Sequence, residues 1–296
     1  MQPPSMTTLP EAPTFEGRPL PDPTEPVFDQ GLTFDVETMI DRRHLLKILG
    51  FSAGAFALAA CTPGSSASPF GSAAATSAAS AAGAACAVIP EETAGPFPGD
   101  GSNGPDVLTQ SGIVRADIRS SFGSSSTVAT GVPLTIKLAI QDLANGCAPL
   151  AKAAVYVWHC DQQGRYSMYS SGVTNENYLR GVQAAGADGV VTFTSVFPAC
   201  YSGRWPHVHF EVYPSQAKAT DPANRIATSQ IALPEATCRA VYATAGYEQS
   251  VPTLSQVSLG SDNVFGDDGG IHELGTVSGS VASGLTVELA VPVRVA

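Results

Sequence analysis

The segment YSGRWPHVHF, residues 201–210, carries the clearest indication of fold and chemistry in this chain. It combines a tyrosine, an arginine and a His-x-His pair in a sequence that holds five histidines in all. In a β-strand, side chains two residues apart point to the same face, so His207 and His209 can present both imidazoles to one point while Val208 turns into the opposite layer. The spacing therefore predicts a strand that carries a metal chelate.

Strand-like segments recur through the rest of the chain from Cys86 onward. Clusters of Gly, Asn, Asp and Ala, such as residues 143–146 and 187–189, separate them as turn signals. No stretch carries a long helical period with caps, so the sequence predicts an all-β sandwich with short helical turns near 174–178 and 235–242. The strand-like segments are Val132–Gln141, Ala154–His159, Val190–Phe197, His207–Tyr213, Arg225–Leu233 and Leu285–Val295.

Composition divides the chain into four parts. Residues 1–41 are acidic and proline-rich, which predicts disorder. Residues 42–61 contain Arg42-Arg43, a short apolar run and Leu-Ala-Ala before Cys61; this is typical of a twin-arginine export signal, and the run is short for a membrane span. Residues 62–85 are almost entirely Ser, Ala, Gly and Pro, which predicts a flexible linker. Residues 86–296 are predicted to form one domain.

Two features of the export signal have alternative interpretations. Leu-Ala-Ala-Cys61 resembles a lipoprotein processing site, which would make Cys61 a lipid anchor to a membrane; the alternative is an ordinary cleavage site followed by an unrelated cysteine. Either Met39, three residues before Arg42, is the true start and the upstream segment is a mis-assigned extension, or the signal has an unusually long N-terminal region. In each case the sequence predicts export by the twin-arginine route, to the cell surface or the extracellular space.

Charge and cysteine content narrow the class of protein. From residue 62 on there are eleven Lys and Arg against eighteen Asp and Glu, which argues against nucleic acid as a partner. Five cysteines follow Cys61, and export favours disulfides, but the odd number leaves at least one thiol free or intermolecular. Their pairing is left open. No Cys-x-x-Cys occurs, which argues against a zinc site built on thiolates.

Two tyrosines join the two histidines as candidate metal ligands. Tyr166 lies at the end of a turn that follows the strand-like segment 154–159, and Tyr201 opens the segment 201–210. Phenolate is a hard, strongly donating oxygen ligand, and imidazole is a borderline one. A set of two tyrosines and two histidines therefore suits ferric iron better than zinc or copper.

These motifs together resemble the intradiol ring-cleavage dioxygenases, a family that includes the protocatechuate 3,4-dioxygenases and the catechol 1,2-dioxygenases. The resemblance covers most of residues 86–295 and depends on the order and spacing of several motifs. It implies a β-sandwich with an iron site. The motifs are PEETAGP (residues 90–96), Val157-Trp158-His159 with Asp161, Gly164 and Tyr166, LRGVQ (residues 179–183), Tyr201-x-Gly203-Arg204, and His207-x-His209.

Carried over residue by residue, the resemblance implies the following roles. Tyr201 leaves the metal when substrate binds, Arg204 stabilises negative charge that builds on the substrate ring, and Gln230 lies near the bound substrate. The implied reaction takes a catechol-type aromatic diol and O2, inserts both oxygen atoms and cleaves the ring between the two hydroxylated carbons to a cis,cis-muconate-type diacid. The implied ligands of non-haem Fe(III) are Tyr166, Tyr201, His207 and His209.

The chain also departs from the family pattern. Ala94 and Phe97 stand where many relatives have Glu and Tyr, and that tyrosine helps to shape the substrate pocket, so the preferred ring substituent is left open. Ala199-Cys200 replaces a frequent Gly-Trp before Tyr201. The helical N-terminal domain of the catechol 1,2-dioxygenases has no counterpart in residues 62–85, which points to the protocatechuate-like, stand-alone branch and leaves the oligomeric state open.

A second hypothesis is an exported β-sandwich module that binds aromatics or carbohydrate without turnover. The intact ligand set argues against it, because a degenerate site usually loses a ligand. A third, metal storage or a copper or zinc site, conflicts with the two phenolates. Of the other histidines, His159 follows Trp158 on a predicted core strand and is expected to be structural, while His272, in a Gly/Asp loop, carries no signal.

Overall fold

A computed structural model describes residues 14–15, 18–19 and 86–295 of the chain. The chain separates into two units, Met1–Gly83 and Ala84–Ala296. In the first, β1 (Thr14–Phe15) and β2 (Arg18–Pro19) form an antiparallel pair. Apart from this pair, the predicted disorder of residues 1–41, the export signal with Cys61 and the linker 62–85 lie outside the described residues.

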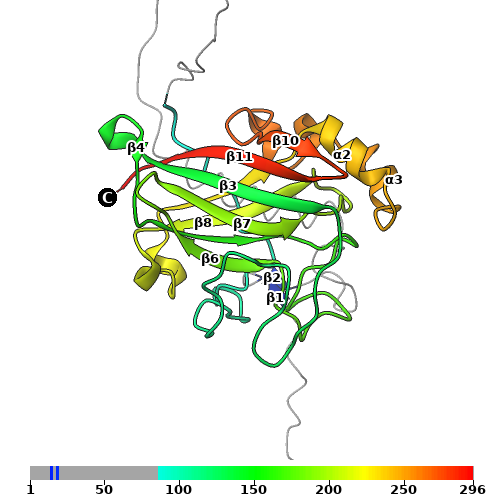
Figure 1. Ribbon diagram of the computed structural model, residues 1–296, viewed down its shortest axis with the longest axis horizontal. Coiled ribbons are helices and arrows are strands. Elements are labelled where there is room, and N and C mark those ends of the chain that lie inside the picture. Colours follow the sequence, from blue (N-terminus) through cyan, green and yellow to red (C-terminus); the bar gives the residue numbers. More distant parts are fainter. Residues whose placement is uncertain (1–13, 16–17, 20–85, 296) are drawn as a thin grey trace, which may run out of the picture. The chain divides into compact units, whose positions relative to one another are not determined.

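The second unit is a sandwich of two β-sheets (Figure 1), which confirms the predicted all-β architecture. One sheet has the order β10-β11-β3-β4, with β7 also pairing with β3, and the other has the order β6-β5-β8-β9. The pairing of β11 with β3 is parallel, and the other pairs are antiparallel. The strands are β3 (Pro133–Asp142), β4 (Ala148–Pro149), β5 (Ala154–Trp158), β6 (Arg180–Ala184), β7 (Val190–Val196), β8 (His207–Tyr213), β9 (Ala227–Ala232), β10 (Thr276–Ser280) and β11 (Gly284–Val293).

All six predicted strands are present, with β8 at the expected bounds. The helical turn expected near 235–242 is α2 (Glu235–Tyr242), whereas 174–178 forms turns without a helix. The strands β6 and β10 were not predicted because each is short and has little apolar alternation; both lie at the edge of a sheet. The remaining short elements are α3 (Ser250–Leu254), η2 (Leu143–Asn145), η3 (Gln216–Lys218), η4 (Pro222–Asn224), η5 (Leu259–Ser261) and η6 (Phe265–Asp267).

The main core lies between the two sheets and follows from strict alternation along the strands. In β3, every second residue from Leu134 to Ile140 is buried while those between are partly exposed. On the facing sheet, Val208 and Phe210 of β8 point into the same core. Each such side chain contributes roughly 1.5–3 kcal/mol when it is fully buried, so the alternation fixes the register and the face that each strand presents.

The strand β8 is buried on both of its faces. Along His207–Tyr213, successive side chains point alternately inward and outward. Val208 and the other inward-facing side chains contact the other sheet. A second cluster, which includes Val107, Tyr156 and Tyr166, covers this outward face. The loops of residues 94–122 and 160–169 supply most of that cover, so polar side chains of β8 are enclosed rather than exposed to solvent.

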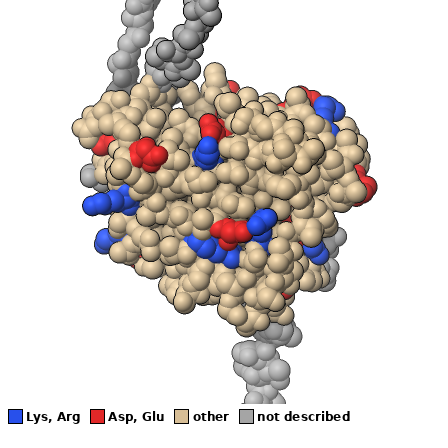
Figure 2. Space-filling model, in the orientation of Figure 1, with Lys and Arg blue, Asp and Glu red and all other residues tan. Residues whose placement is uncertain are grey.

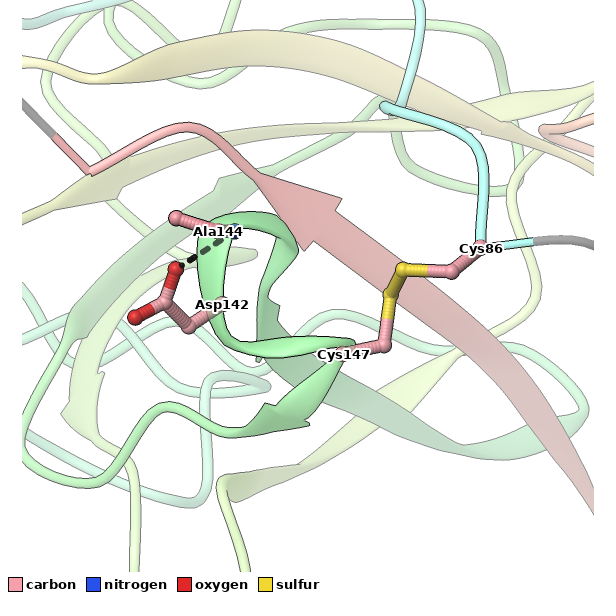
Figure 3. Close-up of a disulfide and its surroundings, with 4 residues drawn as sticks. All are labelled: Cys86, Asp142, Ala144 and Cys147. Carbon is pink, nitrogen blue, oxygen red and sulfur yellow. Dashed lines mark hydrogen bonds between the residues drawn. A yellow bond between two sulfur atoms is a disulfide. The ribbon is translucent and has the colours of Figure 1, made fainter.

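A disulfide joins Cys86, near the beginning of the domain, to Cys147 in the turn after β3 (Figure 3). The turn itself is stabilised by Asp142, whose side chain accepts a hydrogen bond from the Ala144 backbone N–H at 3.0 Å. The other three cysteines of the domain are buried thiols: Cys160, Cys200 and Cys238. The sequence predicted disulfides in general but not this pair.

The surface carries few charges. On the face shown in Figure 2, Lys, Arg, Asp and Glu are scattered. Some charged side chains of the domain form pairs of opposite sign, such as Lys137 with Glu288, whose charged atoms lie 3.0 Å apart. No continuous basic patch is visible on that face. Within the described ranges, no helix is long and apolar enough to cross a membrane.

Candidate metal centre

The two predicted histidine ligands project from the same face of β8. Their Nε2 atoms lie 3.0 Å apart. The Nδ1 atom of His207 lies 2.5 Å from the Trp205 carbonyl; since a carbonyl can only accept, this nitrogen carries the proton and leaves a lone pair on Nε2. Trp158, which faces His209 across β5 and β8, stacks on that imidazole with ring centroids 4.9 Å apart and planes 7° apart. Both imidazoles are therefore held in place from outside the centre.

The two predicted tyrosine ligands come from loops. Tyr166 follows a turn in which the Asp161 carboxylate accepts hydrogen bonds from the Gln163 and Arg165 backbone N–H groups at 2.9 Å. Tyr201 follows β7 by a short segment that includes the buried Cys200. Tyr166 is almost fully buried, whereas Tyr201 is partly exposed and is followed by two exposed residues, so the two phenols differ in their freedom to move.

The four side chains converge on one point. The Tyr166 hydroxyl lies 3.1 Å from the Tyr201 hydroxyl, 3.3 Å from His207 Nε2 and 3.2 Å from His209 Nε2. The Tyr201 hydroxyl lies 3.1 Å from His207 Nε2. Donor atoms at this spacing can be neighbouring ligands of one metal ion, whose bonds to imidazole nitrogen measure about 2 Å.

Burial sets the protonation states in this centre. It lowers the pKa of His207 to about 3, with the nearby Arg204 charge adding to the effect, and it lowers the pKa of His209 well below its ordinary value. Burial also raises the pKa of both Tyr166 and Tyr201 well above the usual phenol range. The imidazoles are thus neutral, the form that binds metals, while a bound cation would favour loss of the phenol protons.

The donor set fits a metal ion. Two neutral imidazoles and two phenols enclose the point with no carboxylate among them, and phenolate oxygens favour a hard, highly charged cation such as ferric iron. Among the described residues, no group of three or more His, Cys, Asp and Glu side chains could hold a metal ion. That result is consistent with this centre, since only two of its four donors are of those residue types.

A hydrogen-bonded pair of side chains lies beside the histidines. Gln230 faces His209 across β8 and β9, and its side-chain oxygen accepts a hydrogen bond from Arg204 Nη2 at 2.6 Å. Its amide nitrogen donates to the Thr93 carbonyl at 2.9 Å. The structure thus brings together all six side chains that the sequence singled out: Tyr166, Tyr201, Arg204, His207, His209 and Gln230.

Part of the chain matches a known protein family, and its fold matches solved structures. Residues 104–220 match the protein-family model described as "Dioxygenase". An intradiol ring-cleavage dioxygenase from Tetranychus urticae is 24% identical, with a TM-score of 0.57, over 71% of this chain and 95% of that chain. Residues 104–220 therefore carry the signature of a dioxygenase domain, and the second unit shares the fold of an intradiol ring-cleavage dioxygenase.

Two further comparisons are with a bacterial dioxygenase domain and with curated protein sequences. The dioxygenase domain of a dioxygenase carbohydrate-binding protein fusion from the cellulolytic bacterium Streptomyces sp. SirexAA-E is 22% identical, with a TM-score of 0.45, over 71% of this chain and all of that chain. No curated protein sequence matches this dioxygenase. Intradiol dioxygenases generally use non-haem Fe(III), which is the ion favoured by the donor set described above.

Sequence reasoning about this dioxygenase missed two residues at the centre. Gly95 adopts a φ of +70°, and a side chain there would lie 3.3 Å from the His209 ring, so glycine is required for the segment to pass so close. The PEETAGP motif signalled the segment but not this contact. Asp262 bonds to Arg204 at 3.0 Å from a position 58 residues away in the sequence, and no local pattern marks it.

The histidine predicted to be structural lies outside the centre. The His159 side chain is buried, with Nε2 2.7 Å from the Ser195 hydroxyl and Nδ1 2.7 Å from the Cys160 carbonyl. Both ring nitrogens are therefore engaged in local hydrogen bonds. His272 is exposed on a loop of this dioxygenase.

Proposed function

We propose that this dioxygenase binds Fe(III) through Tyr166, Tyr201, His207 and His209 and cleaves a catechol-type diol between its two hydroxylated carbons. Both atoms of O2 enter a cis,cis-muconate-type diacid. The observation that carries the proposal is the convergence of two phenol oxygens and two imidazole nitrogens, for which five of the six pairwise distances are 3.0–3.3 Å. When bound, ferric iron supplies Lewis acidity and a template for the diol and O2.

The two tyrosines have different parts in this proposal. Tyr166 is enclosed and packs against Phe97, with ring centroids 5.1 Å apart, so it remains a fixed ligand. Tyr201 is partly exposed and can swing away to make room for the substrate. As it leaves, its phenolate oxygen would take one of the two protons that the diol loses on binding through both oxygens, and a hydroxide ion from solvent would take the other.

Arg204 and Gln230 act on the substrate. Although burial opposes it, the charge of Asp262 and then of Tyr201 raises the pKa of Arg204, so the guanidinium stays charged. A fixed cation beside the ring stabilises negative charge that builds during attack by O2, and a donor of this kind contributes roughly 3–4 kcal/mol in other enzymes. Gln230 holds Arg204 and spans to Thr93, which fixes that cation relative to the β8 histidines.

The experiment is the visible spectrum of the purified full-length protein, before and after anaerobic addition of catechol, hydroxyquinol or protocatechuate. We expect a tyrosinate-to-iron band that shifts with one diol and decays when O2 is admitted, with one O2 consumed per diol and both atoms of labelled O2 in the product. The matched control is Tyr166→Phe, which should lose most of the band. A colourless protein that stays unresponsive after reconstitution with ferric or ferrous iron would contradict the proposal and support a binding module.

We further propose export by the twin-arginine route with lipidation at Cys61. The Cys86–Cys147 disulfide supports export, because disulfides persist in oxidising compartments. Fractionation of cells that express the full-length chain tests both parts. Replacing Arg42 and Arg43 by Lys should retain the protein inside the cell, and Cys61→Ala should release it from the membrane fraction; an unchanged distribution of either variant would contradict that part.

A further inference from the structure

The guanidinium of Arg204 is held on one side only. Its Nε donates to Asp262 at 3.0 Å and its Nη2 donates to Gln230 at 2.6 Å. Among the described residues, its other N–H groups form no hydrogen bond, and the side chain is 14% exposed. Two of the five N–H groups thus fix the orientation of the cation, and the others remain for a ligand.

The Asp262 carboxylate is itself fixed by the backbone. One oxygen accepts hydrogen bonds from the Val264 and Phe265 N–H groups at 2.8 and 3.1 Å, which form the turn into η6. The other oxygen accepts from Arg204 and from the Trp205 backbone N–H at 2.6 Å. The side chain is fully buried. With four donors, this carboxylate cannot move without breaking its turn, so it provides a rigid support.

The same carboxylate supports the backbone between Arg204 and His207. It binds the N–H of Trp205, and the carbonyl of Trp205 lies 2.5 Å from His207 Nδ1. One buried side chain therefore holds both the guanidinium and the peptide that connects it to a candidate metal ligand. Geometry of this kind orients groups at metal sites, and its loss typically costs about 10- to 100-fold in activity or metal affinity.

We propose that Asp262 is a positioning residue that fixes Arg204 for ring cleavage. The inference rests on the proposed function, because it assumes that Arg204 acts on the substrate. Among the described residues, Asp262 forms no hydrogen bond with the four candidate ligands; it binds Arg204 and the Trp205 N–H directly, and its charge also acts on His207 and Tyr201. The alternative is a purely structural role, in which the carboxylate serves only the turn at 262–265.

Two variants separate these roles. Asp262→Asn keeps an oxygen for the Val264 and Phe265 N–H groups but loses the charge that faces Arg204. Asp262→Ser keeps a local acceptor for the turn and removes the contact with Arg204 altogether. We expect both to lower kcat by about 10- to 100-fold, with KM near the wild-type value, because the missing contact acts on charge that develops only in the transition state. Asp117→Asn is the matched control, because Asp117 also pairs with an arginine and accepts a backbone N–H, but at the exposed surface.

A double-mutant cycle and a second readout complete the test. In an Arg204→Gln background, Asp262→Asn should reduce kcat by a clearly smaller factor than in the wild type, because the part of its effect that depends on the contact with Arg204 is already lost. In NMR spectra of the metal-free protein, the Nε–H signal of Arg204 should be protected from exchange in the wild type and lost in Asp262→Asn, while that of half-buried Arg115, which donates to the Arg180 carbonyl, persists in both. An unchanged kcat, an equal loss in the Arg204→Gln background or a loss of the Arg115 signal would overturn the inference. Failure of the wild type to cleave any diol would instead refute the proposed function.

Discussion

Two arginines lie near the candidate metal centre, and their hydrogen bonds differ. Arg180 is buried, and its guanidinium forms five hydrogen bonds of 2.7–3.1 Å, all to neutral oxygens. Arg204 forms one bond to a carboxylate and one to an amide, and its other N–H groups form none among the described residues. The acceptors of Arg180 are the Phe97 and Pro98 carbonyls, the Tyr156 hydroxyl, and the Ser167 hydroxyl and carbonyl.

The difference shows which arginine can take part in chemistry. A guanidinium has five N–H groups, so Arg180 has none left for a ligand. Its bonds connect residues 97–98 to Ser167, the neighbour of Tyr166, and Phe97 packs on the Tyr166 ring. Arg180 therefore assembles the loops around the centre, while Arg204 keeps donors free beside it.

The largest expected effect comes from removing the five hydrogen bonds of the Arg180 guanidinium. Arg180→Met should lower the free energy of unfolding by about 3–5 kcal/mol, because the Phe97 and Ser167 carbonyls and the Tyr156 and Ser167 hydroxyls lose a charged donor at roughly 1–3 kcal/mol for each group left unpaired, while the Pro98 carbonyl keeps the Tyr156 hydroxyl. Urea unfolding followed by fluorescence measures this. Arg204→Gln is the comparison variant and should lose less, since Asp262 keeps three backbone N–H donors. An equal loss of unfolding free energy in Arg180→Met and Arg204→Gln would contradict the structural difference between the two arginines.

The opposite pattern is expected in catalysis. Arg204→Gln should reduce kcat by about 100- to 1,000-fold, as does the loss of a donor aimed at developing charge in other enzymes. The iron content and the tyrosinate band should remain, because Arg204 is not a candidate ligand. Steady-state O2 uptake with the preferred diol, together with metal analysis, measures both. A variant that loses iron in proportion to activity would show that Arg204 is structural.

A smaller effect tests whether the segment ahead of residues 97–98, which Arg180 binds, also supports His209. Gly95→Ala should cost roughly 1–2 kcal/mol of stability because of its positive φ, and the added methyl group should also displace the His209 ring and weaken iron binding. Gly172→Ala is the matched control, since it has a φ of +80° but no atom within 4 Å of the added carbon. Equal iron affinity in the two variants would show that the contact with His209 is unimportant.

The smallest expected effect concerns the buried carboxyl group of Glu273. Glu273 is buried, and burial, followed by the charges of Glu92, Asp268 and Asp267, raises its pKa from 4.5 to about 8. The folded state then binds a proton more tightly than the unfolded state, so stability falls as the pH rises from 4.5 to 8. Glu273→Gln should remove this loss and raise Tm at pH 9 relative to the wild type, with little change at pH 5. A parallel pH dependence of Tm in both proteins would contradict it.

The sequence was sufficient for those parts of the site that depend on local geometry. The period of a strand placed His207 and His209 on one face, and turn chemistry placed Tyr166 at a loop end. Gln230 came from the family resemblance, and the pairing of β9 with β8 brings it beside His209. These are short-range rules or motifs whose spacing is fixed by the pairing of adjacent strands.

The rest of the site depends on contacts between distant segments. Asp262 and Arg204 are 58 residues apart, and their pairing arises only when the turn between η5 and η6 lies against the residues that precede β8. The outward face of the β6-β5-β8-β9 sheet is buried by loops that have no periodic apolar pattern. A sequence pattern predicts which face of a strand is apolar, but it does not predict which loop covers a polar one.

The disulfide of Figure 3 also has a mechanical consequence. Residues 87–95 run along the domain by hydrogen bonds from Ile89 to the Pro292 carbonyl and from Glu92 to the Thr228 carbonyl, and they end with Gly95 against His209. A pull on the chain ahead of Cys86 would otherwise peel this segment away one bond at a time. With Cys86 joined to Cys147, the load passes into the turn after β3 instead, before it reaches Gly95 and the candidate ligand His209.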